Sequence, residues 1–163
     1  MKRPILWLLK LLLTLFTIAS CQRTEFESEV DNSFTTIPKQ GENFQFYTDP
    51  NLFFKLKKQS AEDNLQITSV SREGNSFKII VAYSGGCKKH EVNIVWDGVV
   101  KLSNPCKVNL ILEHNANGDT CEAMVTDTLD LNIPTYFGDM LEADKTDFTV
   151  TTSKDAALHL KDY

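Results

Sequence analysis

Short runs of alternating apolar and polar residues dominate the chain from Phe44 onward, and turn residues separate these runs. A period of two indicates β-strands, each with one face in a core. The sequence therefore predicts an all-β domain over residues 43–163, an antiparallel β-sandwich with an immunoglobulin-like outline. A flattened barrel is the alternative. The predicted strands cover residues 44–46, 52–57, 65–70, 77–83, 91–97, 107–113, 122–131 and 148–150.

Turn residues separate these runs, and in one stretch the spacing of apolar residues changes from that of a strand to that of a helix. Gly74 separates residues 65–70 from 77–83, which predicts a β-hairpin, and Asn117-Gly118 is a strong hairpin signal before the run at 122–131. Asp49-Pro50-Asn51 is interpreted as a turn. Phe137, Met140 and Leu141 recur at helical spacing, so residues 135–143 are expected to form at most one short helix.

The N-terminus has a different pattern. Lys2 and Arg3 precede a short apolar run at residues 11–18, which ends in Ile18-Ala19-Ser20-Cys21. A run this short that ends in small residues predicts a signal peptide over residues 1–20 and not a membrane-spanning helix. The last four residues resemble a bacterial lipobox, which implies acylation of Cys21. A plain secretory signal with an incidental cysteine is the alternative.

The net charge of the chain bears on its partners and on how it attaches to a membrane. The formal net charge of −5 becomes −8 once Lys2, Arg3 and Lys10 leave with the signal peptide. An acidic domain disfavours nucleic acid and anionic lipid as partners, so membrane attachment is expected through the acyl chains alone. Gln22 after the cysteine favours the outer membrane. The polar residues 21–42 are expected to form a flexible tether between Cys21 and the domain.

Cysteines and histidines cluster in two segments, with Cys87 and His90 in the first and His114 and Cys121 in the second. A β-meander of the runs at 91–97, 107–113 and 122–131 brings these segments together. In the simplest register Val92 faces Leu112, His90 faces His114, and His114 faces Cys121. Three candidate ligands then converge at one end of one sheet face, with Cys87 in a loop at the same end. Cys106 falls at the opposite end.

Thiolate and imidazole are ligands that zinc prefers, so Cys87, His90, His114 and Cys121 are a candidate closed structural zinc site. Cu(I) suits the same donors. The competing interpretation is a Cys87–Cys121 disulfide, because an exported protein meets an oxidising compartment. Free thiols are the third possibility. The spacing of the residues does not decide among these alternatives.

No serine or cysteine nucleophile is positioned by any pattern in the chain, so we expect a binding or structural module and not an enzyme. A metal-dependent hydrolase is the enzymatic alternative, with Asp119 or Glu122 as the base beside an open zinc position. A lipoprotein that handles an exchangeable metal ion as cargo is a further alternative.

The central segments also resemble a family. Ser-Gly-Gly-Cys-x-x-His at 84–90, Val-Trp-Asp-Gly at 95–98, Leu-x-His-Asn at 112–115 and Cys-Glu-Ala at 121–123 are similar to small lipoproteins of Bacteroidota-type bacteria. The resemblance covers about forty residues and the lipobox. It implies a joint structural or metal-binding role for Cys87, His90, His114 and Cys121, and it leaves Cys106 outside the pattern.

Overall fold

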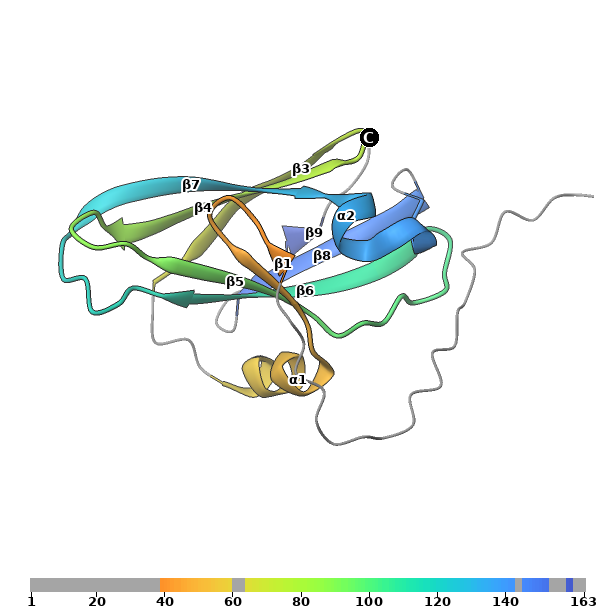
Figure 1. The fold of residues 1–163 in the computed structure, drawn as a ribbon, viewed down its shortest axis with the longest axis horizontal. Helices are drawn as coiled ribbons and strands as arrows, with labels where there is room; N and C mark the ends of the chain where they lie inside the picture. Colours follow the sequence, from red (N-terminus) through yellow and green to blue (C-terminus); the bar gives the residue numbers. More distant parts are fainter. Residues whose placement is uncertain (1–38, 60–63, 143–144, 153–157, 160–163) are drawn as a thin grey trace, which may run out of the picture.

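The fold of the described residues is a β-sandwich. A computed structural model describes residues 39–59, 64–142, 145–152 and 158–159 (Figure 1). The predicted signal peptide, Cys21 and the tether up to residue 38 lie outside these residues. Strands dominate the described part and form two sheets, which confirms the all-β prediction. No helix among the described residues has the length and apolar character needed to cross a membrane.

The two sheets differ in size. The larger sheet has six strands in the order β1-β2-β5-β6-β8-β9, and the smaller sheet has three in the order β3-β4-β7. The larger sheet contains β1 (Lys39–Gln40), β2 (Gln45–Thr48), β5 (Glu91–Trp96), β6 (Cys106–Asn115), β8 (Thr146–Thr152) and β9 (Leu158–His159). The smaller sheet contains β3 (Gln66–Glu73), β4 (Ser76–Gly85) and β7 (Ala123–Asn132). The sheet thus begins at Lys39, inside the segment predicted as a tether.

Two pairings correct the expectation of a wholly antiparallel sandwich. Strands β2 and β5 pair in parallel, and so do β6 and β8. Parallel neighbours need a long connection between them. Here the chain supplies it by crossing to the smaller sheet and back, through β3 and β4 in the first case and through β7 in the second.

The inward faces of both sheets form one hydrophobic core. Phe77, Ile79 and Val81 of β4 are fully buried, and the ring of Phe77 stacks on Phe148 of β8 with centroids 4.6 Å apart. The alternation of apolar and polar residues correctly predicts which side chains of these strands face the core. The other predicted inward residues that are buried are Tyr83, Val92, Ile94, Trp96, Val108, Leu110, Leu112, Leu129, Leu131 and Val150.

Residues 52–57, predicted as a strand, belong to helix α1 (Pro50–Lys58). Asp49 is its N-cap, because its side chain accepts a hydrogen bond from the backbone N–H of Leu52 at 2.9 Å, and Pro50 occupies the first turn. The alternation of Leu52, Phe54 and Leu56 resembles that of a strand. The two buried residues of α1 are Phe53 and Leu56, which are three positions apart, as on one face of a helix.

Helix α1 covers the outer face of the larger sheet (Figure 1). Phe53 and Leu56 pack against Val95 of β5 and Ile111 of β6, which are cross-strand partners on that face. Both strand residues are almost completely buried, at 0% and 3% exposed. The sandwich therefore has a third layer over the middle of the larger sheet.

The β3–β4 hairpin is confirmed, with Glu73 opposite Ser76 and a two-residue turn that contains Gly74. The predicted β-meander is wrong. Strands β5 and β6 do form a hairpin, but Val92 lies opposite His114, a register shifted by two residues that preserves which side chains face the core. Strand β7 leaves this sheet and pairs antiparallel with β4.

The turn at Asn117-Gly118 exists but joins strands of different sheets. Both residues have positive φ, at 52° and 64°, and the N–H of Asp119 donates to the carbonyl of Ala116 at 2.9 Å. This is the backbone geometry of a tight turn that favours Asn-Gly. After this turn the chain crosses to the smaller sheet, where β7 pairs with β4.

The short helix near the C-terminal end begins earlier than predicted. Helix α2 spans Ile133–Phe137, with Asn132 as N-cap and Pro134 in the first turn, and a 3₁₀ turn, η1, follows at Gly138–Met140. Because α1 is also helical, the described residues contain two α-helices where at most one was expected. Figure 1 shows α2 at one end of the sandwich.

Replacing Phe53 or Leu56 with Ala is expected to lower the free energy of unfolding by about 2–5 kcal/mol, because each change leaves a cavity under α1. Phe54→Ala is the matched control, since Phe54 is 53% exposed on the same helix. Its effect is expected to stay within about 0.5 kcal/mol. Urea unfolding followed by circular dichroism measures all three. Equal losses at Phe53 and Phe54 would show that α1 does not cover the sheet.

Candidate functional site

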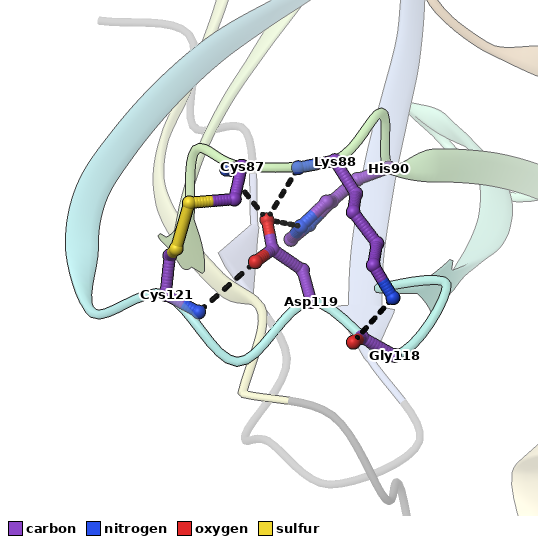
Figure 2. Close-up of a disulfide and its surroundings, with 6 residues drawn as sticks. All are labelled: Cys87, Lys88, His90, Gly118, Asp119 and Cys121. Atoms are coloured by element: carbon purple, nitrogen blue, oxygen red, sulfur yellow. Dashed lines mark hydrogen bonds and ion pairs between the residues drawn. A yellow bond between two sulfur atoms is a disulfide. The ribbon is translucent and has the colours of Figure 1, made fainter.

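Two loops that cross between the sheets meet at one end of the sandwich. Residues 86–90 lead from β4 to β5, and residues 116–122 lead from β6 to β7. Figure 2 shows Cys87, Lys88 and His90 of the first loop facing Asp119 and Cys121 of the second. The predicted candidate residues all lie in or beside these loops, with His114 near the end of β6. Cys106 begins β6 and is buried at that strand's other end, as the sequence predicted.

Cys87 and Cys121 form a disulfide bond between the two loops, with their Cα atoms 5.9 Å apart (Figure 2). This separation is typical of disulfides. The bond is the alternative that the sequence left open at these positions. Because both sulfur atoms are used in it, neither is available as a thiolate ligand while the bond is intact.

The carboxylate of Asp119 is the centre of the contact between the loops. Its Oδ2 accepts hydrogen bonds from the backbone N–H groups of Cys87 and Lys88, both at 2.9 Å, and its Oδ1 accepts from the N–H of Cys121 at 2.9 Å. The ring of His90 adds a fourth contact, with Nε2 3.2 Å from Oδ2. The Asp119 side chain is only 1% exposed. One buried carboxylate thus holds both loops.

These donors keep Asp119 ionised. The N–H of Cys121 has the largest effect, followed by that of Lys88, and together with Cys87 and His90 they hold the pKa of Asp119 well below its usual range. A carboxylate with so low a pKa is a poor general base. The base role that the hydrolase alternative gave to Asp119 therefore has little support. Glu122, the other candidate base, is exposed beside the disulfide.

His90 and His114 lie together, although cross-strand pairing does not place them. Nδ1 of His90 is 3.0 Å from Nε2 of His114. Because ionised Asp119 can only accept, Nε2–H of His90 donates to its Oδ2. The ring of Tyr83 stacks on His90, with centroids 4.5 Å apart. A hydrogen-bonded chain thus runs from His114 through His90 to Asp119.

Gly85 and Gly86 make room for this chain. A Cβ atom on Gly85 would lie 2.5 Å from Cε1 and Nε2 of His90, so a side chain there would displace the imidazole. Gly86 has a φ of 107°, in the region that favours glycine. The Gly-Gly pair before Cys87 therefore has a physical reason, which is the close approach of His90 to the backbone of β4.

Lysine and asparagine side chains fasten the loops further. Nζ of Lys88 donates to the carbonyls of Gly118 and Asn117 at 2.8 and 3.1 Å. Nδ2 of Asn117 donates to the carbonyl of Lys89 at 2.8 Å. Neither Lys88 nor Asn117 was predicted from the sequence as a site residue. The sequence carries a signal only for Asp119. Its position two residues before Cys121 fits an Asx-turn, in which the Asp side chain accepts a hydrogen bond from the backbone N–H two residues further along.

Tyr83 is the hydrogen-bond partner of Asp127, a carboxylate on the otherwise apolar face of β7. The hydroxyl of Tyr83 donates to Oδ2 of Asp127 at 2.5 Å. Burial, with this hydrogen bond and the charge of Asp127, raises the pKa of Tyr83 to about 12. A small open cleft of about 180 Å³ lies beside Tyr83. It is lined by Asn64, Tyr83, Ser84, His114, Ala116, Asp119, Thr120 and Cys121.

Cys87, Asp119 and Cys121 form one close group of candidate metal ligands, and the two histidines lie outside it. The Sγ atoms of Cys87 and Cys121 and a carboxylate oxygen of Asp119 lie within 4.8 Å of one another. His90 contacts this group through Asp119, and His114 contacts it through His90. The convergence of His90, His114 and Cys121 at one end of the sandwich is therefore observed. The zinc site made of all four predicted residues stays a prediction.

No family model matches the chain, and no curated protein matches it. Among solved structures, the chain is similar to a protein of unknown function, DUF1344, from Bacteroides vulgatus. The identity is 13%, the TM-score is 0.45, and the match covers 71% of this chain and 53% of that one. The chain thus spans about half the length of that protein.

The chain is also similar to a NigD-like immunity protein from Bacteroides caccae. The identity is 18%, the TM-score is 0.43, and the match covers 77% of this chain and 68% of that one. Both proteins come from Bacteroides.

Asp119→Asn is expected to destabilise the protein at neutral pH and to weaken its acid sensitivity. The pKa of Asp119 is lower in the folded protein than in the unfolded chain. Its carboxylate therefore stabilises the fold fully above about pH 4, and this contribution is lost as the pH falls toward the folded-state pKa. Urea unfolding between about pH 2.5 and pH 7 should show a shallower acid slope for the variant.

Asp139→Asn is the control for this measurement, because Asp139 is an exposed carboxylate in η1. It removes the same charge without touching the loops. If both variants keep the acid slope of the unmodified protein, Asp119 does not fasten the loops through its ionised form.

Proposed function

We propose that the protein is a lipid-anchored, non-enzymatic binding or structural module of the bacterial cell envelope, stapled at one end by the Cys87–Cys121 disulfide. The disulfide is the observation that carries this proposal. It lies between loops that each pass from one sheet to the other, so it holds the two halves of the sandwich together. No metal ion is needed for that role.

The chemistry of the cysteines supports the proposed compartment. Structural disulfides persist in oxidising environments such as the bacterial periplasm and the cell surface. The N-terminal pattern independently favours export, and Cys21 in its lipobox-like segment favours anchoring by acyl chains. These two arguments use different residues and agree. An outer-membrane location rests on Gln22 alone and is part of the proposal.

A non-enzymatic role is supported by how fully the polar groups of the site are engaged. Cys87 and Cys121 are joined to each other, and the Asp119 carboxylate accepts from backbone donors of both loops. The cleft of about 180 Å³ is smaller than typical small-molecule sites of roughly 300–1,000 Å³. It suits a single side chain or a small polar molecule better than a cofactor. Recognition of a partner across the surface is therefore favoured.

Expression of the full chain in a Gram-negative host tests the anchor and the staple together. The protein is expected in the membrane fraction with acyl chains on Cys21, and peptide mapping after alkylation is expected to recover Cys87 linked to Cys121. Cys21→Ser should move the protein out of the membrane fraction, because the anchoring acyl chains are lost.

The membrane fraction tests the lipid anchor, and the peptide map tests the disulfide, so each can fail without the other. Cys21→Ser leaves both loops unchanged, so the linked Cys87–Cys121 peptide should persist in that variant. A Cys21→Ser protein that stays with the membrane would refute the lipid anchor. Alkylated Cys87 and Cys121 in protein isolated from the envelope would refute the staple.

A further inference from the structure

The disulfide lies beside a carboxylate and an imidazole that could serve as metal ligands. The Sγ atoms of Cys87 and Cys121 and an oxygen of Asp119 already lie within 4.8 Å of one another. Ligand atoms around a tetrahedral zinc ion stand roughly 3–4 Å apart, given zinc–ligand distances of about 2.0–2.3 Å. Once the S–S bond opens, the two sulfur atoms would have to move apart to this spacing, and the sulfur–oxygen distances would contract by about 1 Å or less.

His90 lies next to this group and contacts its carboxylate. Its Nε2 is 3.2 Å from Oδ2 of Asp119, and both side chains are almost completely buried, at 2% and 1% exposed. Its other nitrogen, Nδ1, is held by Nε2 of His114 at 3.0 Å. Histidines that bind metals are commonly oriented by such a second partner. The structure thus distinguishes His90, beside the group, from His114, which orients His90.

The loops are also held together by contacts that do not involve the sulfur atoms. Lys88 donates to Asn117 and Gly118, and Asn117 donates to Lys89. The Asp119 carboxylate accepts N–H groups from both loops. None of these hydrogen bonds uses a sulfur atom, so each keeps its donor and its acceptor when the disulfide opens. The two thiols would therefore stay close to each other and to Asp119, as a preorganised site requires.

We propose that reduction of the Cys87–Cys121 bond by a dithiol converts the staple into a site for one Zn²⁺ ion, bound by Cys87, Cys121, Asp119 and His90. The dithiol supplies two electrons and two protons and becomes a disulfide itself, while the S–S bond opens to two thiols. Zinc then replaces the two thiol protons, which pass to solvent. The inference rests on the proposed staple, because the oxidised form excludes the ion.

This ligand set differs from the one that the sequence predicted. Asp119 replaces His114 as the fourth ligand, and His114 becomes the partner that orients His90. With zinc on Nε2 of His90, the proton of that ring lies on Nδ1, which can donate to Nε2 of His114. Two thiolates, one imidazole and one carboxylate are all donors that zinc accepts.

Cobalt titration of the full-length Cys21→Ser chain tests the proposal. A phosphine reduces the disulfide without adding competing thiols, and Co²⁺ then serves as a coloured substitute for zinc. The reduced protein is expected to bind one equivalent, with the visible absorption of a tetrahedral site and sulfur-to-cobalt charge transfer, and Zn²⁺ should displace it. The oxidised protein should show neither signal. Absence of both signals in the reduced protein would overturn the proposal.

Variants assign the ligands. His90→Gln and Asp119→Asn are expected to weaken Co²⁺ binding by more than about 100-fold, and His114→Gln by about 10- to 100-fold, as for a residue that only orients a ligand. Asp139→Asn is the control and should change nothing. This ligand set would be overturned in favour of the two-cysteine, two-histidine site by one result. In that result His114→Gln weakens Co²⁺ binding as much as His90→Gln does, and Asp119→Asn does not weaken it.

Circular dichroism of each reduced sample covers the case in which reduction loosens the fold. Zinc that restores the spectrum at one equivalent supports the site, and zinc that binds without restoring it overturns the site. Either failure is distinct from failure of the proposed function. The linked Cys87–Cys121 peptide in envelope protein is recovered whether or not the reduced form binds metal.

Discussion

The buried carboxylate of Asp119 is the interaction on which this end of the molecule depends. It accepts N–H groups from the β4–β5 loop and from its own β6–β7 loop, and it contacts the ring of His90. Both loops pass from one sheet to the other. Fastening them to each other therefore fastens the two sheets, at a place where the apolar core no longer does so.

The disulfide and the carboxylate act on the same pair of loops by different means. The disulfide joins residues 34 positions apart and limits the freedom of the unfolded chain. The Asp119 hydrogen bonds act in the folded state and depend on a charge that several donors stabilise. The histidine pair, stacked on Tyr83, fills the space between the loops and the core.

Much of the fold could be predicted from periodicity, because an alternating strand shows which face is buried whatever its neighbours are. The inward residues of β4, β5, β6 and β8 were predicted correctly for this reason. Strand neighbours could not be predicted the same way. Asn117-Gly118 specifies a tight turn but not the sheet that the chain enters next, so β7 was placed beside β6 when it lies beside β4. In α1, the short alternation of Leu52 and Phe54 outweighed the Asp-Pro helix start.

The candidate site was predicted in part for a similar reason. Cys87, His90, His114 and Cys121 were expected at one end of the sandwich, and they lie there even though the register and the topology differ. A two-residue register shift preserves the side-chain faces, so the histidines kept their side of the sheet. The role of Asp119 depends on backbone N–H groups of the opposite loop, and no side-chain pattern in a sequence reports those.

A double-mutant cycle tests most directly whether the disulfide and Asp119 fasten the loops together. The cycle combines Cys87→Ser/Cys121→Ser with Asp119→Asn and measures the free energy of unfolding of each variant at neutral pH. Loss of the disulfide alone should cost about 3–4 kcal/mol for a separation of 34 residues. The expected result is a combined loss smaller than the sum, by more than about 0.5 kcal/mol, because Asp119 stabilises loops that the disulfide has already brought together. Losses that add within about 0.3–0.5 kcal/mol would contradict a joint role.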